Sequence, residues 1–217
     1  MRKTALLPAA GLGIRSGLAF PKELINVGDR ALIDHSVDLL REAKITDVVV
    51  VVREGKEVIA DYLRARYRNL VNFETVFQRP PFGCLIDPIK VALPVLSGSR
   101  VHLLLPDTVV SPNPFLQVRE REGLFLHCFK AENDRWRNFG VVARGRVLEK
   151  PKTFVSEICW GAASWDDAFS RHLEKHTDFP EAMNSFGFGH AVDIETYKDY
   201  GLEPASFEMI NLPCPSS

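Results

Sequence analysis

The chain has 217 residues, of which 46% are hydrophobic and 25% are charged, and its formal net charge is −1. This length and composition suit one sizeable soluble α/β domain, and the near-neutral charge excludes a global field that would attract nucleic acid or an anionic membrane. No apolar run reaches the roughly 18–20 residues of a membrane span, the N-terminus lacks a signal-peptide pattern, and the cysteines show no C-x-x-C spacing. We therefore expect a cytoplasmic protein with free thiols.

The N-terminal stretch combines a strand, a small-residue loop and two cations. Residues 3–8 are an apolar run that suits one buried strand, the loop 9–13 follows, and Arg15 and Lys22 come next. Glycines let backbone amides approach an anion, while arginine offers a planar fork and lysine a point charge. It is not a P-loop, since no G-K-[ST] follows, nor a dinucleotide fingerprint, since Ser16 stands at the third glycine position. We predict a polyphosphate site formed by Pro8, Ala9, Ala10, Gly11, Leu12 and Gly13 with Arg15 and Lys22.

Alternating helices and strands follow. Apolar residues recur at helical spacing over 31–44 and 54–67, residues 48–52 are an unbroken run of valine, and residues 72–77 suit another strand. Strand–helix–strand units of this kind predict a parallel sheet with right-handed crossovers.

The loop 78–83 is the second candidate site segment. Gln78 has an amide that can donate and accept, two prolines stiffen the loop, and Gly83 opens a predicted helix that runs to about residue 96. An amide and bare backbone beside a phosphate loop can read the edge of a base. Gln78 and Gly83 are therefore predicted to bind a nucleotide.

A carboxylate follows the next strand. Residues 101–105 are predicted to form a buried strand, and Asp107 follows two residues after its end. Open α/β sheets bind ligands in the crevice beyond the carboxyl ends of their strands. Asp107 is therefore a candidate site residue.

The second half of the chain contains three further predicted strands, at 123–129, 138–143 and 157–163, and a predicted helix at 165–175. The string Glu149-Lys150-Pro151 lies between the last two strands. A glutamate can accept hydrogen bonds from sugar hydroxyls, an adjacent lysine can neutralise a phosphate, and proline ends the strand.

A glycine-rich segment, 186–190, leads to a string that contains Asp193 and ends at Thr196, and the tail from Glu203 is predicted to be peripheral.

In one order along the chain, these stretches resemble the motifs of the nucleotidyltransferase superfamily of sugar-phosphate pyrophosphorylases. The matching strings are A-A-G-x-G-x-R-x(5)-P-K, Q-x-x-P-x-G, the P-D aspartate, G-V-V, E-K-P and the aspartate of D-x-x-T. The resemblance implies a three-layer α/β/α fold with a mostly parallel mixed sheet, Rossmann-like and similar to GT-A transferases. It also implies one domain over 1–217, with a nucleotide-binding half at 1–110, an acceptor-binding half at 111–202 and a peripheral tail at 203–217.

The resemblance further implies Mg²⁺-dependent nucleotidyl transfer from a nucleoside triphosphate to a sugar 1-phosphate or another phosphomonoester. Asp107 and Asp193 would hold Mg²⁺, and Arg15, Lys22 and Asp107 would be catalytic. No nucleic acid or membrane partner is expected, and a homo-oligomer is left open. The residues implied to bind the acceptor are Gly140, Glu149, Lys150, Trp160 and Gly161.

Two alternatives stay open at this point. The short R-x(5)-P-K spacing resembles that of compact cytidylyltransferases, which favours a non-sugar acceptor such as a polyol or choline-type phosphate. Ile14, Asp87 and Glu195 depart from the family pattern, which would suit a catalytically silent nucleotide-sugar-binding protein. The base and the sugar are not fixed by the sequence, because the Gln78 amide can suit either pattern of donors and acceptors.

Overall fold

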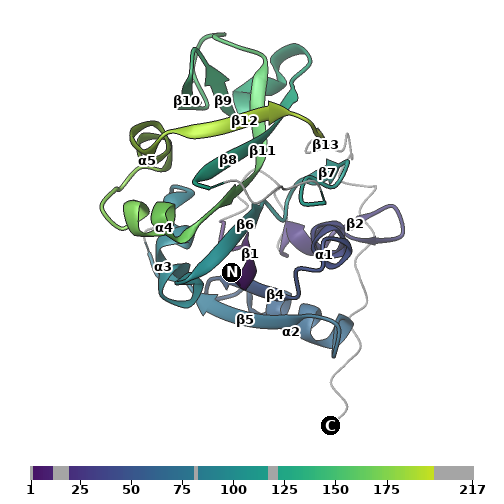
Figure 1. The fold of residues 1–217 in the computed structure, drawn as a ribbon. Coiled ribbons are helices and arrows are strands. Elements are labelled where there is room, and N and C mark those ends of the chain that lie inside the picture. Colours follow the sequence, from purple (N-terminus) through teal and green to yellow (C-terminus); the bar gives the residue numbers. More distant parts are fainter. Residues whose placement is uncertain (1, 12–19, 81–82, 117–121, 198–217) are drawn as a thin grey trace.

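The structure is a computed structural model that describes residues 2–11, 20–80, 83–116 and 122–197 (Figure 1). A nine-stranded mixed sheet forms the centre, in the order β10-β9-β11-β6-β1-β4-β5, with β8 paired to β11 and β12 paired to β8. The pairs β2–β3 and β13–β7 form two small separate sheets. The predicted α/β class with a mixed sheet is confirmed.

The N-terminal half of the sheet is parallel, as the strand–helix–strand pattern predicts. Its valine-rich strands are buried on both faces: in β4, Val48 and Val50 join one core cluster and Val49 and Val51 the other. The four parallel strands are β1 (Arg2–Pro8), β4 (Asp47–Val52), β5 (Asn72–Phe77) and β6 (Ser99–Leu104). The helices between them are α1 (Leu32–Glu42), α2 (Glu57–Arg66) and α3 (Ile86–Leu96).

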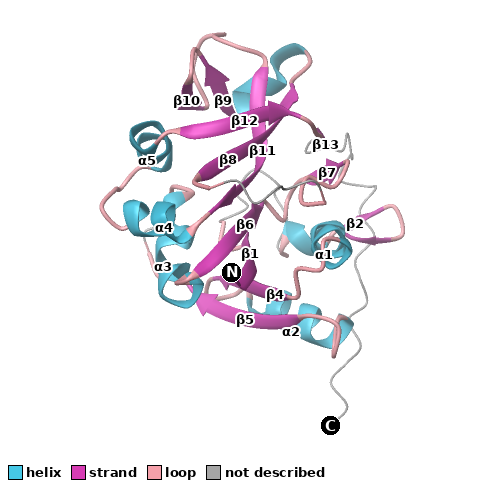
Figure 2. Cartoon of the chain, in the orientation of Figure 1, coloured by secondary structure: helices cyan, strands magenta, loops and turns pink. Residues whose placement is uncertain are grey.

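Helices cover both faces of the sheet (Figure 2). Residues of α1 and α2 pack in one core cluster, and residues of α3, α4 (Asp167–Leu173) and α5 (Phe179–Phe186) pack in the other. The result is the three-layer arrangement that the family resemblance implies.

The C-terminal half of the sheet is largely antiparallel and is built around β11. This strand pairs antiparallel with β6, β8 and β9, so that Ala162 lies opposite both Leu104 and His127. Its strands are β8 (Leu124–Lys130), β9 (Gly140–Ala143), β10 (Arg146–Glu149), β11 (Ile158–Trp165) and β12 (Phe188–Val192). The short elements are η2 (Lys22–Leu24), β2 (Asn26–Val27), β3 (Arg30–Ala31), β7 (Val109–Ser111), η3 (Asn133–Asn138) and β13 (Glu195–Tyr197).

Three features differ from the sequence prediction. The helix predicted at 165–175 covers only α4, because Trp165 still belongs to β11 and the Asp166 carboxylate caps the helix start. Helix α5 was not predicted, although Asp178 caps it by accepting a hydrogen bond from the Glu181 backbone at 2.7 Å. The glycine-rich segment is mostly strand β12, because parallel pairing with β8 provides backbone partners despite Gly189.

The strand order sets the position of the site. From β1 the chain proceeds to β4 and β5 on one side, and then returns to place β6 on the other side of β1. The order therefore reverses between β1 and β6, and such a switch point opens a crevice at the carboxyl ends of the strands. The loop after β1 and Asp107 after β6 both lie at this edge. Within the described ranges, no helix is long and apolar enough to cross a membrane.

Candidate active site

The loop after β1 begins as a continuation of the sheet. Pro8 pairs with Val51, and the Ala9 backbone donates a hydrogen bond to the Val51 carbonyl at 2.7 Å. Ala9 and Ala10 are buried, and a Cβ added at Gly11 would meet only open space. The predicted residues Leu12, Gly13 and Arg15 lie outside the described residues.

Lys22 and Asp107 come together at the switch point. Lys22 begins η2, and Asp107 follows β6 in a turn in which the Thr108 backbone donates to the Leu105 carbonyl. The Lys22 Nζ lies 2.5 Å from Asp107 Oδ2, and Thr108 donates its hydroxyl to Asp107 Oδ1 at 3.1 Å. The Lys22 side chain is 30% exposed and that of Asp107 is 17% exposed, so solvent reaches this contact. We call Lys22 with Asp107 the site pair.

A second lysine lies at the same edge, and the sequence analysis missed it. Lys56 Nζ donates to both oxygens of Glu23, at 2.9 and 3.0 Å, and to the Ala9 carbonyl at 3.0 Å. Its side chain is 5% exposed and that of Glu23 is 2% exposed. Burial lowers the pKa of Lys56 below its usual value, although the Glu23 charge opposes this shift. A lone lysine after a glycine turn gives no sequence signal of burial. We call Lys56 with Glu23 the buried pair.

The loop after β5 is fastened to the start of α3. Gln78 is buried, and its backbone donates to the Val52 carbonyl at 2.8 Å. The Asp87 carboxylate accepts from the backbones of Gly83, at 3.4 Å, and Cys84, at 3.2 Å. Asp87, a departure from the family pattern, therefore shapes the loop that carries Gly83.

Asp193 is held by a buried histidine. His127 on β8 donates from Nδ1 to Asp193 Oδ2 at 3.0 Å, because an ionised carboxylate can only accept. The Asp193 backbone donates to the Cys128 carbonyl at 3.0 Å, and the rings of Phe115 and Phe125 pack edge-on against His127. Glu195, the other departure nearby, begins β13 and pairs with Ser111 in regular antiparallel register.

Four of the predicted acceptor residues, Gly140, Glu149, Trp160 and Gly161, lie on three neighbouring strands, and Lys150 directly follows β10. Glu149 pairs with Gly140, where an added Cβ would collide with the indole of buried Trp160. An added Cβ at Gly161 would crowd the Thr196 side chain. Packing therefore already requires glycine at both positions, and their contact with an acceptor stays a prediction.

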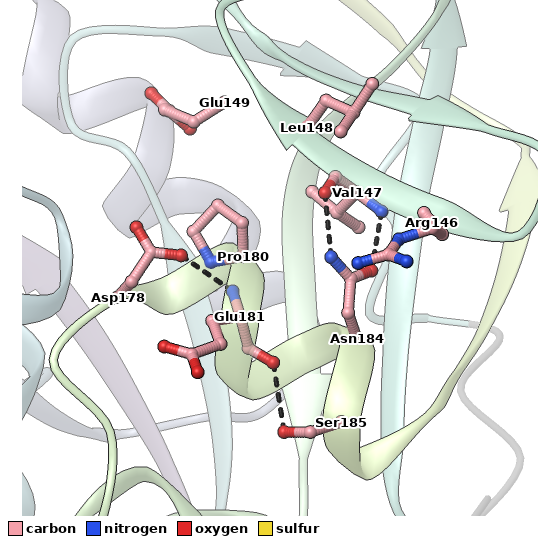
Figure 3. A pocket seen from close by; sticks show the side chains of 9 residues that line it. All are labelled: Arg146, Val147, Leu148, Glu149, Asp178, Pro180, Glu181, Asn184 and Ser185. Carbon is pink, nitrogen blue, oxygen red and sulfur yellow. Dashed lines mark hydrogen bonds between the residues drawn. The ribbon is translucent and has the colours of Figure 1, made fainter.

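A cavity of about 550 Å³ lies between β10 and α5 (Figure 3). Asn184 joins its two walls by accepting from the Val147 backbone N–H at 2.7 Å and donating to the Val147 carbonyl at 2.9 Å. Of the predicted site residues, Glu149 lines this cavity, and it also pairs with Lys150 at 3.2 Å. The lining residues are Arg146, Val147, Leu148, Glu149, Asp178, Pro180, Glu181, Asn184 and Ser185.

Comparison with known proteins places this chain in a family. Residues 5–122 match the family model described as the MobA-like NTP transferase domain. The chain belongs to this family. The match includes both members of the site pair and ends before Glu149 and Asp193.

The curated relatives of this NTP transferase are longer than the chain, which spans between 36% and 59% of the length of those it matches. It is 41% identical over 120 residues to a UTP–glucose-1-phosphate uridylyltransferase of Komagataeibacter xylinus, covering 52% of this chain and 36% of that protein. It is 29% identical over 168 residues to a mannose-1-phosphate guanyltransferase of Emericella nidulans, covering 70% of this chain and 46% of that protein.

Solved structures share the fold. A UDP-glucose pyrophosphorylase from Acinetobacter baumannii matches with a TM-score of 0.75 at 20% identity, over 91% of this chain and 88% of that one. A UDP-glucose pyrophosphorylase complexed with UDP-glucose matches with a TM-score of 0.74 at 18% identity, over 91% and 93%.

The carboxylates suit magnesium only together with a substrate. Among the described residues, no group of three or more histidine, cysteine, aspartate or glutamate side chains is placed to hold a metal ion. Mg²⁺ in enzymes that act on nucleotides typically takes one or two carboxylates, with phosphate oxygens and water as the other ligands. Asp107 and Asp193 have hard oxygen donors of this kind, and both are partly exposed. Each carboxylate therefore has the donor chemistry that Mg²⁺ prefers, and their shared binding of one ion stays a prediction.

Proposed function

We propose that this NTP transferase moves a nucleotidyl group from a nucleoside triphosphate to a sugar 1-phosphate and releases pyrophosphate. The observation that carries the proposal is the contact between Lys22 and Asp107 at the switch point of the sheet. It unites a cation and a carboxylate that are 85 positions apart in the sequence, beside a loop that is bare of side chains at Gly11. Membership of the NTP transferase family supports the same reaction.

The reaction needs charge control more than proton transfer. A phosphate oxygen of the acceptor forms a bond to the α-phosphorus, the bond from that phosphorus to the bridging oxygen breaks, and pyrophosphate leaves with the electron pair. The second pKa of a phosphomonoester is about 6, so the nucleophile is already ionised at neutral pH. Positioning and neutralisation of negative charge are then the main contributions of the protein.

The site pair supplies opposite charges for these tasks. We assign Lys22 to the transferring α-phosphate, because its ammonium lies at the switch point and keeps access to solvent. We assign Asp107 and Asp193 to Mg²⁺, which when bound would neutralise phosphate charge. Arg15 with the loop after β1 would receive the leaving pyrophosphate, and Gln78 with Gly83 would contact the base.

The acceptor residues complete the proposal. Glu149 and Lys150 carry complementary charges and are about half exposed, so both can contact a sugar phosphate. Gly140, Trp160 and Gly161 would shape the wall beside them. Glu149 also lines the cavity between β10 and α5.

The direct test is pyrophosphate release with Mg²⁺ across a grid of the common nucleoside triphosphates and a panel of phosphomonoesters. The panel contains hexose 1-phosphates together with polyol and choline-type phosphates. Release that requires one triphosphate and one sugar 1-phosphate supports the proposal, and release with a non-sugar phosphate alone would replace the acceptor class. Nucleotide binding without release across the whole grid would overturn it in favour of a silent binding protein.

A further inference from the structure

The surroundings of Lys56 leave it no means of contacting a substrate. A lysine ammonium has three N–H donors, and Lys56 directs them to the Ala9 carbonyl and the two oxygens of Glu23, at 2.9 to 3.0 Å. Both side chains of the buried pair are almost fully enclosed. Lys56 can therefore affect the reaction only indirectly, through its contacts with Ala9 and Glu23.

The backbone brings Lys56 to this position from the adjacent strand. After β4 the chain turns sharply, with Gly55 at a φ of +81° and the Lys56 backbone donating to the Arg53 carbonyl at 3.0 Å. Because Ala9 still hydrogen-bonds to Val51 of β4, the end of β1 lies beside this turn. The ammonium can then contact the Ala9 carbonyl, two residues before Gly11.

Glu23 connects the buried pair to the site pair, because it directly follows Lys22 in η2. A 3₁₀-helix has about three residues per turn, so neighbouring side chains point roughly 120° apart. Glu23 points into the core toward Lys56, and Lys22 points toward Asp107. A rotation of η2 that withdrew Glu23 would also turn Lys22 away from Asp107.

We infer that Lys56 is a positioning residue, which aims Lys22 at Asp107 by holding Glu23 and fixes the end of β1 beside it. The inference rests on the proposed function, in which Lys22 acts on the transferring phosphate. The competing interpretation is a purely structural ion pair. Such a pair can often be replaced by apolar side chains without loss of stability.

The two interpretations predict different turnover for one double variant. Lys56→Met alone leaves the Glu23 carboxylate buried without its cation and can unfold the domain, so the deciding protein is the double variant Glu23→Met with Lys56→Met. Its apolar side chains restore the melting temperature toward that of the wild type. If Lys56 positions Lys22, kcat stays lower by about ten- to a hundredfold, while KM for the triphosphate changes much less.

A matched control is Lys90→Met. Lys90 is a part-buried lysine on α3, and its Nζ donates to the His176 carbonyl at 2.9 Å. This variant removes a lysine–carbonyl hydrogen bond of the same kind and should leave kcat unchanged.

A second measurement does not depend on turnover. Lysines are reductively methylated with ¹³C, and the Lys22 resonance is assigned by its absence in Lys22→Arg. In the wild type we expect the chemical shift of this resonance to differ from those of exposed lysines, because the Asp107 carboxylate is in contact with the Lys22 ammonium. In the double variant this chemical shift should move toward theirs. An unchanged Lys22 resonance together with wild-type kcat in the double variant would overturn the inference. If the wild type releases no pyrophosphate, the proposed function fails, and the Lys22 resonance still decides whether Lys56 positions Lys22.

Discussion

The buried pair and the site pair lie at the same edge of the sheet in different surroundings. Both join a lysine to a carboxylate, but the buried pair is at most 5% exposed, whereas Lys22 and Asp107 are 30% and 17% exposed. A buried charge is costly unless its partner is present, whereas an exposed ion pair contributes little to stability. The buried pair therefore holds backbone in place, whereas the site pair leaves its charges accessible to solvent.

The largest expected effect is on stability at the buried pair. Lys56→Met leaves the Glu23 carboxylate buried without a cation, which typically costs about 3–5 kcal/mol of unfolding free energy. Lys22→Met should cost no more than about 1 kcal/mol, because the site pair is partly solvated. Urea unfolding of both variants beside the wild type measures the difference. Equal losses would remove the distinction between the pairs.

The next largest effect is on turnover at the site pair. Lys22→Ala and Asp107→Asn should each lower kcat by about 10²–10³, or roughly 3–4 kcal/mol of transition-state stabilisation, because each removes a preorganised charge. Far-UV circular dichroism and the melting temperature should stay close to those of the wild type. Near-normal pyrophosphate release by either variant would contradict the assignment of these residues.

A buried histidine, which is hydrogen-bonded to a hydroxyl instead of a carboxylate, differs from the buried pair in its pH dependence. His102 on β6 shares a hydrogen bond of 3.0 Å with the Ser164 hydroxyl, and burial lowers its pKa from 6.5 to about 3. Since the unfolded chain takes up this proton near pH 6.5 and the folded chain does not, stability is complete above pH 6.5 and falls as the pH decreases toward about 3. By pH 5 the loss attributable to His102 should be about 2 kcal/mol.

Urea unfolding at pH 7.5 and pH 5 measures this loss, and His102→Asn is the comparison protein. The asparagine keeps a polar group near Ser164 and removes the titration. We expect the variant to lose less stability than the wild type between the two pH values, whatever its stability at pH 7.5. Equal losses would show that His102 does not contribute to acid sensitivity.

The smallest expected effect concerns the loop after β5. Burial raises the pKa of Cys128 and of Cys159 to about 12, so both stay protonated and unreactive, whereas Cys84 is exposed. In a Cys214→Ser background, alkylation of the native protein should modify Cys84 alone. If Gly83 contacts the nucleotide, saturating Mg²⁺ and triphosphate should slow this reaction severalfold. An unchanged rate under binding conditions would place the nucleotide elsewhere.

Local sequence pattern was enough for much of the fold. The apolar and valine-rich runs, the amphipathic helices and the polar loops between them predicted β1, β4, β5 and β6 in order. The pairing of strands that are distant in the sequence could not be predicted from local pattern. The glycines around β12 indicate a loop, but in the structure β8 provides hydrogen-bonding partners for its backbone. The local sequence also does not indicate that β11 lies antiparallel beside β6.

The residues of the candidate site also divide into those that local sequence predicts and those that depend on distant segments. Lys22 and Asp107 could be predicted because each lies in a recognisable string, and the structure brings them to 2.5 Å. Lys56 could not, because its burial depends on Ala9 and Glu23, which the fold supplies from elsewhere. The packing reason for glycine at position 140 was equally hidden, since it requires the Trp160 indole from a neighbouring strand.

³¹P NMR of the products shows whether the site pair performs the proposed nucleotidyl transfer. The wild type is incubated with Mg²⁺ and the triphosphate and sugar 1-phosphate that it prefers, in parallel with Lys22→Ala. We predict equal amounts of pyrophosphate and a new diphosphate diester from the wild type, and at most about one-hundredth as much of either product from the variant over the same period. Release of inorganic phosphate without a diester would contradict the proposed reaction, and the same products at the same rate from Lys22→Ala would contradict the role of Lys22.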